Sequence, residues 1–333
     1  MKLIDYINKD NRGFFCGSFG ANGLYLIDST FYEVYNSPEK QLEMSLKLNE
    51  TYNGDFAYIL DDGQIFCETL GLELLKPDYD FPSVLNHPIQ SIKDLEKYTV
   101  PDPYTSGRMP LNLKSAKLVV ENIDKPQGMS LQGPFTLAIQ LAGATQLLRS
   151  IINNKEFVER ILDFTTETVL RYAKAMEKVG VQYISIAEPA SVTLSPTHFK
   201  QYVVSNLNKI YDELNCWKAL HICGNTMDFL PLMLECNLDA LSLDQIMDYR
   251  KVINLIPEDI VLAGNIDPVE RLSEGTKDEV RYEVLSLLKS MRNHRNHMVD
   301  FGCTCYNGTP IEVLQTLVET AQTPYSQLDN IKL

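Results

Sequence analysis

The feature that most constrains the fold of this chain is a run of alternating strand-like and helix-like segments in its second half. Short runs of apolar and β-branched residues predict strands, and stretches with apolar residues at spacings of three and four predict amphipathic helices. The expected strands cover residues 181–187, 217–222, 240–243, 260–263 and 298–302. The expected helices cover residues 154–179, 195–214, 227–236, 249–256 and 277–291, and a last helix opens at Pro310. Five such units in succession indicate a parallel sheet with helical crossovers.

The first half adds weaker strand candidates at residues 13–19, 56–60 and 129–131. Together with the five later strands they make eight, which favours an α/β fold of the (β/α)8 TIM barrel type over an open sheet. A chain of 333 residues can form such a barrel as one unit, so we predict a single domain over residues 1–333. Residues 71–125 are rich in Pro, Asp and Tyr, and we expect them to be an insertion or long excursion after the second strand.

Charge and composition restrict the partners of this chain. Thirty Lys and Arg against 44 Asp and Glu give a net charge of −14, and the one short basic stretch is 292–295. A nucleic acid or an anionic membrane is therefore an unfavourable partner. The first residues lack the apolar core of a signal peptide, and no apolar run approaches the roughly 18 residues of a membrane span, so we expect a cytoplasmic protein. Seven cysteines, an odd number, indicate reduced thiols that can bind metal.

Soft metal ligands stand at the ends of two predicted strands. In a barrel the chemistry lies where strands meet the following loops. His221 and Cys223 are two residues apart, so an extended strand directs both side chains to one face, and Cys303 follows the last predicted strand. Three protein ligands with a vacant fourth position are typical of a catalytic zinc. Because two thiolates balance the +2 charge, such a site suits the alkylation of a thiol better than the activation of water. Either segment alone would more often be structural.

Other polar residues also follow the predicted strands, and we expect some to orient substrate and others to cap helices. Glu188 and Asn265 are predicted to be catalytic, and Asn225, Asp244 and Asp267 to contact the cofactor. Three interpretations of Glu188 remain open. It is an exchangeable fourth zinc ligand, a partner that orients His221, or a solvated loop carboxylate.

Several segments of the chain match a known pattern, namely Gly133–Leu137, Glu188–Ala190, Leu194–Pro196, His221–Thr226, Gly264–Pro268, Gly302–Cys303 and Thr309–Glu312. Over nearly its whole length the chain resembles the uroporphyrinogen decarboxylase superfamily. Within it, the paired His-x-Cys and Gly-Cys segments resemble the branch of zinc-dependent corrinoid methyltransferases, which includes the methylcobalamin:coenzyme M methyltransferases.

The resemblance implies that His221, Cys223 and Cys303 bind Zn²⁺ and that the enzyme is a methyltransferase. The methyl donor would be a methylcobalamin-type corrinoid carried by a separate corrinoid protein. The acceptor would be a small thiol, such as coenzyme M, that attacks the methyl group as a thiolate and leaves Co(I). Zinc would act as Lewis acid and template. Cys305 is additional to this pattern, as a core thiol or as a competing ligand.

Alternatives to this function remain open. The acceptor could be tetrahydrofolate or another molecule, and a metal-free lyase like uroporphyrinogen decarboxylase is a second possibility. Against the lyase, residues 11–20 lack the Arg-rich segment that clamps carboxylates in the decarboxylases. A third possibility is that this chain is a non-enzymatic relative that only binds a corrinoid protein or has a regulatory role. The retention of three soft metal ligands argues against this possibility.

Overall fold

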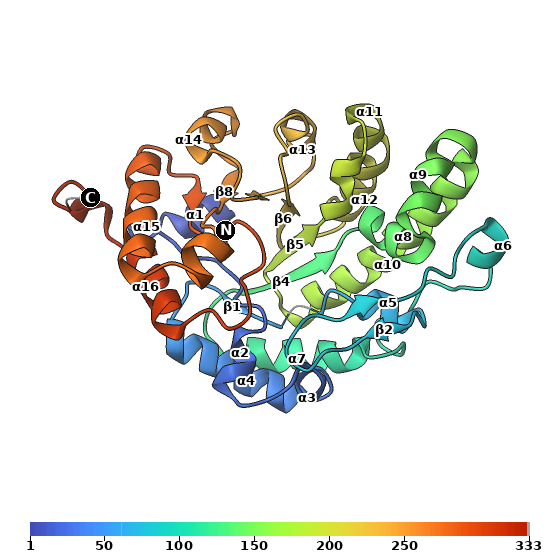
Figure 1. The fold of residues 1–333 in the computed structure, drawn as a ribbon, viewed down its shortest axis with the longest axis horizontal. Coiled ribbons are helices and arrows are strands. Elements are labelled where there is room, and N and C mark those ends of the chain that lie inside the picture. Colours follow the sequence, from blue (N-terminus) through green and yellow to red (C-terminus); the bar gives the residue numbers. More distant parts are fainter. Residues whose placement is uncertain (61, 332–333) are drawn as a thin grey trace.

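A computed structural model describes residues 1–60 and 62–331, and within them a curved parallel sheet of seven strands forms the centre of the molecule (Figure 1). Its strands, in spatial order, are β1 (Ala57–Tyr58), β4 (Gln127–Gln132), β5 (Tyr183–Ala187), β6 (Trp217–Ile222), β7 (Ala240–Leu243), β8 (Val261–Ala263) and β9 (His297–Met298). Each neighbouring pair is parallel, with registers such as Ala187 opposite His221. The predicted barrel class is confirmed.

A single β-bridge, and not a regular strand, occupies the eighth position of the barrel. The prediction of a strand over residues 13–19 is therefore wrong. Phe15 pairs in parallel with Val299, which follows β9. On its other side, the carbonyl of Phe15 accepts a hydrogen bond from the backbone N–H of Asp55, at 3.1 Å, just before β1. The segment therefore joins the two edges of the sheet and closes the ring over a very short length.

Helices lie around the sheet (Figure 1). They are α1 (Leu3–Ile7), α2 (Asn22–Leu26), α3 (Phe31–Tyr35), α4 (Pro38–Tyr52), α5 (Ile65–Thr69), α6 (Ile92–Leu95), α7 (Met109–Asn122), α8 (Pro134–Ala142), α9 (Ala144–Asn153), α10 (Lys155–Val179), α11 (Pro196–Phe199), α12 (Ser205–Tyr211), α13 (Leu230–Met233), α14 (Tyr249–Val252), α15 (Lys277–Met291) and α16 (Ile311–Ala321). Shorter 3₁₀ or π turns are η1 (Pro189–Thr193), η2 (Lys200–Val204), η3 (Ile253–Leu255), η4 (Pro268–Ser273) and η5 (Tyr325–Gln327).

The longest predicted helix is confirmed as α10, and its ends have clear causes. The side chain of Asn154 accepts a hydrogen bond from the backbone N–H of Phe157 at 3.3 Å, which caps the first turn. Gly180 ends the helix with φ 110°, a left-handed conformation that favours glycine.

Several predicted elements are shorter than expected, among them the strand predicted over 56–60, which is reduced to β1. The helix expected over 227–236 is reduced to α13, because Pro231 is tolerated only in a first helical turn. The helix expected over 249–256 changes to a 3₁₀ turn after Val252. The strand expected over 298–302 is the two-residue β9, followed by isolated bridges that Val299 and Phe301 form with residues outside named strands.

The excursion over 71–125 contains a small antiparallel hairpin and two helices. In the hairpin, β2 (Leu74–Leu75) pairs with β3 (Ser83–Val84). Helix α7 packs between α4 and α10. The tip of the hairpin reaches the loop after β9, where the side-chain amide of Asn307 donates a hydrogen bond to the carbonyl of Tyr79. That residues 1–333 form one domain stays a prediction.

No single helix in the described part of the chain is both long and apolar enough to cross a membrane. Helices α8 and α9 pass that test only as a pair, and they are bent by 105° at their junction.

Candidate metal centre and barrel cavity

The inside of the barrel has two layers of side chains. Because side chains alternate along a strand, every second residue of each strand points inward. The layer nearer the amino ends of the strands is apolar and packs on Leu3 and Ile7 of α1, and it comprises Phe14, Cys16, Phe56, Tyr183, Ala219, Ala240, Val261, Ala263 and Met298. Two residues further along several of these strands, the inward positions become polar, namely Tyr58, Ser185, His221, Ser242 and Asp300. The sequence therefore builds an apolar floor with a polar layer above it.

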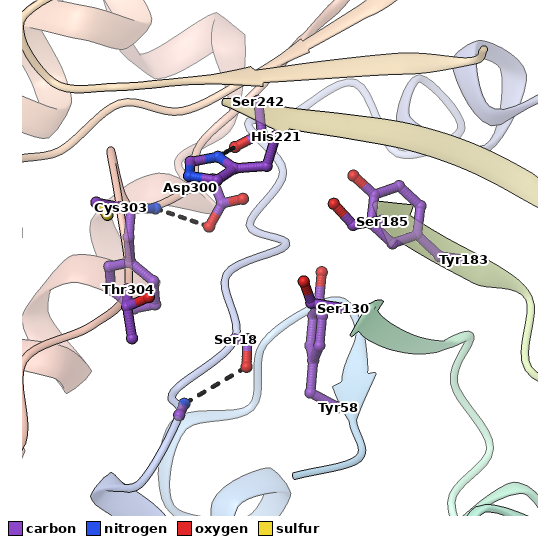
Figure 2. A pocket seen from close by; sticks show the side chains of 12 residues that line it. Ser18, Tyr58, Ser130, Tyr183, Ser185, His221, Ser242, Asp300, Cys303 and Thr304 are labelled. Atoms are coloured by element: carbon purple, nitrogen blue, oxygen red, sulfur yellow. Dashed lines mark hydrogen bonds between the residues drawn. The ribbon is translucent and has the colours of Figure 1, made fainter. Parts of the chain in front are cut away.

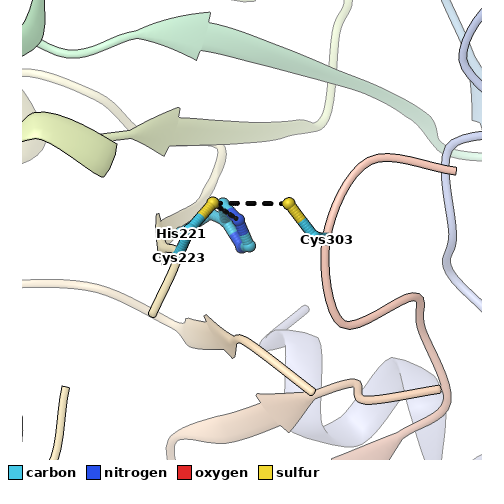
Figure 3. Close-up of side chains that lie close together, drawn as sticks. All are labelled: His221, Cys223 and Cys303. Atoms are coloured by element: carbon cyan, nitrogen blue, oxygen red, sulfur yellow. Dashed lines mark hydrogen bonds between the residues drawn. The ribbon is translucent and has the colours of Figure 1, made fainter. Parts of the chain in front are cut away.

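His221, Cys223 and Cys303 come together at the mouth of the barrel (Figure 3). Their ligand atoms all lie within 4.8 Å of one another. His221 Nε2 is 3.1 Å from Cys223 Sγ, and Cys223 Sγ is 3.4 Å from Cys303 Sγ. The ligand atoms of a tetrahedral zinc ion are separated by about 3.5–3.8 Å. A small outward movement of these side chains would therefore make room for the ion, so the residues fit zinc.

The electrostatics of the two thiols also fit a cation. Hydrogen bonds from Cys223 and then from His221 hold the pKa of the Cys303 thiol well below its usual value. The hydrogen bond to Cys303 raises the pKa of Cys223 in turn, because the pair shares a proton. A divalent cation would stabilise the second thiolate. The distances and the charge of the cluster therefore both fit a soft divalent metal.

The ring of His221 is oriented by a hydroxyl group from the next strand. Its Nδ1 lies 2.9 Å from Ser242 Oγ, which leaves Nε2 directed at the two sulfur atoms. A metal-binding imidazole is commonly fixed in this way through its other nitrogen. Ser242 was absent from the sequence-based site.

Asp244 and Asn265 hold the loops around the cluster. Asp244 is 7% exposed, and its carboxylate accepts hydrogen bonds from the backbone N–H groups of Gly224 at 2.7 Å and Ile246 at 3.0 Å. The side-chain amide of Asn265 donates to the carbonyls of Asp244 at 3.1 Å and Met247 at 2.7 Å. Both side chains therefore connect loops at the mouth.

Asn225 and Asp267 make local contacts. The side-chain oxygen of Asn225 accepts a hydrogen bond from the N–H of Met227, and the residue is exposed. Asp267 caps the turn η4 by accepting from the N–H groups of Val269 and Glu270, at 2.8 and 2.9 Å. Their predicted contact with a cofactor stays a prediction.

Glu188 lies outside the cluster of ligand atoms. It is fully buried, and its carboxylate accepts hydrogen bonds from the N–H of Phe135 and from the N–H and hydroxyl of Thr136, at 2.7–2.8 Å. Both oxygens thus bind the first turn of α8. Because the carboxylate is fully buried, the solvated interpretation is wrong, while a role as fourth metal ligand or as partner of the His221 ring stays a prediction. Burial raises its pKa to about 7, against the lowering effect of these hydrogen bonds.

A small cavity of about 100 Å³ lies in the polar layer, and His221 and Cys303 are among the residues that line it (Figure 2). Asp300 also lines it, and burial raises the pKa of this carboxyl group to about 6. The remaining lining is mostly hydroxyl groups and glycine or aromatic side chains, from Ser18, Gly20, Tyr58, Ser130, Tyr183, Ser185, Ser242, Phe301 and Thr304. Sequence reasoning missed these residues. The available signal was a polar side chain at alternate positions of otherwise apolar parallel strands.

Comparison with known proteins places the chain in a family. Residues 24–324 match the model of the uroporphyrinogen decarboxylase (URO-D) family, and the chain belongs to this family. The family predicted from the sequence is thereby confirmed.

Relatives with known names include methyltransferases and decarboxylases. The chain is 32% identical to the methylcobamide:CoM methyltransferase MtbA of Methanosarcina mazei over 72% of this chain and 71% of that protein. It is 30% identical to MtaA, a methylcobamide:CoM methyltransferase of Methanosarcina barkeri, over 90% of this chain and 89% of that protein. A uroporphyrinogen decarboxylase of Carboxydothermus hydrogenoformans is 25% identical, over 87% of this chain and 84% of that protein. A solved methyltransferase structure from Methanosarcina mazei superposes with a TM-score of 0.85 and 27% identity, and covers 93% of this chain and 94% of that one.

Proposed function

We propose that this protein transfers a methyl group from a methyl-Co(III) corrinoid, carried by a separate protein, to a small thiol, with zinc bound by His221, Cys223 and Cys303. The observation that carries the proposal is the Cys₂His cluster at the barrel mouth, with its ligand atoms within 4.8 Å of one another. The names of the relatives MtbA and MtaA support the corrinoid donor and the thiol acceptor.

In this reaction each residue of the site would have a separate role. Zinc, when bound, supplies a Lewis acid that lowers the pKa of the acceptor thiol. Ser242 orients the His221 ring, and Asp244 fixes the loop that carries Cys223 through its bond to the N–H of Gly224. In the transfer itself, a C–S bond forms as the Co–C bond breaks. Both electrons of the broken bond stay on cobalt, which becomes Co(I).

A corrinoid protein would dock over the barrel mouth. The loops that follow five successive strands, β5 to β9, each expose an apolar side chain, with exposed fractions from 37 to 62%, namely Val192, Met227, Ile246, Val269 and Tyr306. Exposed apolar groups around a polar centre are typical of an interaction surface. The tip of the β2–β3 hairpin, through Tyr79, extends this rim.

Metal analysis tests the zinc site, with a matched control in the same loop. Zinc in protein purified without chelator should be about one ion per chain, and Cys303→Ala should lose most of it. Cys305→Ala should keep it, because the Cys305 thiol is buried and accepts a hydrogen bond from Asn22 at 3.2 Å, outside the cluster. Full zinc retention in Cys303→Ala would refute the ligand set.

An activity assay tests the methyl transfer. The zinc-loaded protein should demethylate free methylcobalamin slowly with a suitable thiol, and Cys303→Ala should not. If thiols and tetrahydrofolate all fail with both free and protein-bound methylcobalamin while zinc is fully loaded, the proposed function is wrong. Zinc content near zero in the wild type would instead favour the metal-free lyase.

A further inference from the structure

The charge of the barrel cavity restricts the acceptor. Asp300 is the one carboxylate among the twelve described residues that line the cavity, and none of the twelve is Lys or Arg. The lining therefore offers hydroxyl groups, the metal centre and one negative charge. An acidic group in a partly closed site is stabilised by a cation brought close to it, and it repels an anion.

The surroundings of the cavity do not reverse this preference. The chain as a whole carries a net charge of −14, so the long-range field also opposes the entry of an anion. A thiol that carries a sulfonate or a carboxylate as its second group would enter this cavity against both effects. Both effects would favour the entry of a thiol that carries an ammonium group.

We propose that the methyl acceptor of this protein is a small aminothiol, whose ammonium group pairs with Asp300 while its sulfur is directed to the metal centre. The inference rests on the proposed function, because it needs a thiol acceptor at His221, Cys223 and Cys303. It also separates this chain from its relatives MtbA and MtaA, whose names give the sulfonate thiol coenzyme M as acceptor.

The backbone supports this position of Asp300. Asp300 is three residues before Cys303 and lines the same cavity as His221 (Figure 2). One of its oxygens accepts a hydrogen bond from the N–H of Phe301 at 2.7 Å, which fixes the carboxylate. Gly17 passes close by, and a Cβ there would lie only 2.9 Å from Asp300 Oδ1. The absence of a side chain at Gly17 thus leaves room for this carboxylate.

Three thiols of one length test the proposal, because they differ only in the group at the far end. They are cysteamine, which ends in an ammonium group, 2-mercaptoethanol, which is neutral, and 2-mercaptoethanesulfonate, which is coenzyme M. We would measure their dissociation constants for the zinc-loaded protein by calorimetry at pH 7.5. Cysteamine should bind at least about tenfold more tightly than the sulfonate, and the affinity of the neutral thiol should lie between the two.

Asp300→Asn removes the charge and keeps the shape of the side chain. The variant should bind cysteamine about tenfold more weakly, bind 2-mercaptoethanol with unchanged affinity and bind the sulfonate more tightly. The control is Asp259→Asn, at an exposed position away from the cavity, which makes the same change in net charge. It should alter none of the three dissociation constants. The wild-type preference among the thiols is measured without any variant, so it tests the proposal even if Asp300→Asn fails to fold.

Several results would overturn the inference. They are a wild type that prefers the sulfonate or shows no preference, one that binds none of the three thiols, and an Asp300→Asn variant that changes all three affinities equally. An equal change would indicate that Asp300 acts on the thiol group itself. Methyl transfer to coenzyme M in preference to cysteamine would overturn the inference and leave the proposed function standing. Preferred binding of cysteamine without methyl transfer to any acceptor would overturn the proposed function and, with it, the role of the aminothiol as methyl acceptor, and only the binding preference would remain.

Discussion

Replacement of Glu188 by Gln tests whether this buried carboxylate stabilises the first turn of α8. The carboxylate accepts three hydrogen bonds, from Phe135 N–H and from the N–H and hydroxyl of Thr136. An amide has one oxygen, so its NH₂ group must face at least one of these donors. Loss of the acceptor for one buried donor costs about 1–3 kcal/mol. The variant should therefore unfold at a lower concentration of urea than the wild type at pH 5.

The pH dependence gives this prediction a sharper form. Burial raises the pKa of Glu188 to about 7 in the folded protein, from an ordinary value of 4.5. Between these two values the folded state holds the proton more tightly than the unfolded state, so stability falls as the pH rises. From pH 5 to pH 8 the loss that Glu188 contributes is about 2.5 kcal/mol. Because Gln does not titrate, the stability advantage of the wild type over Glu188→Gln should shrink by that amount.

The assay is urea unfolding of zinc-loaded wild type and variant at pH 5, 6, 7 and 8, with zinc content measured in parallel. Glu258→Gln, at an exposed position, is the control and should follow the wild type at each pH. A stability difference between wild type and Glu188→Gln that stays constant with pH would refute the reasoning. Loss of zinc from Glu188→Gln would support the interpretation of Glu188 as a metal ligand.

Two further predictions concern neighbours of these groups. Ser242→Ala should lower the zinc affinity by about 10- to 100-fold, since the His221 ring loses its orienting partner; competition with a chelator measures this, and an unchanged affinity would refute it. Gly133→Ala should destabilise the protein by about 1–3 kcal/mol, because its Cβ would lie 2.4 Å from the carboxylate carbon of Glu188. Thermal unfolding measures that loss against Gly63→Ala, where a Cβ meets nothing within 4 Å, and equal melting temperatures would contradict it.

The parts of the fold that local signals determine were predictable from the sequence. Helix α15 begins with a capping box, in which Thr276 is the N-cap and Glu279 lies in the first turn, and it ends at Met291, as predicted. Strand β7 also has the predicted bounds. The cluster of His221, Cys223 and Cys303 was predictable for a different reason. The carboxyl ends of parallel strands meet at one end of a barrel, so ligands 80 residues apart in the chain approach each other.

The direction of Glu188 was not predictable, because it depends on a helix that begins more than 50 residues earlier in the chain. A carboxylate after a strand can point to the barrel mouth or to a neighbouring helix terminus, and the sequence around Glu188 does not distinguish the two. The helix α8 presents unpaired N–H groups at Phe135 and Thr136, and a buried carboxylate satisfies them. Tertiary packing therefore decides its role.

The failed strand prediction at residues 13–19 and the overlooked Asp300 have one physical origin. Phe15 forms the bridge that closes the barrel, and a regular strand would continue this pairing through the next residues. The pairing does not continue, and Gly17 packs tightly here, since a Cβ would lie 2.6 Å from the rings of Phe15 and Phe301 and 2.9 Å from Asp300. The chain instead leaves the sheet and brings Ser18 and Gly20 to the cavity. At this irregular eighth position the Asp300 carboxylate lies beside Gly17 and lines the same cavity as His221 and Cys303.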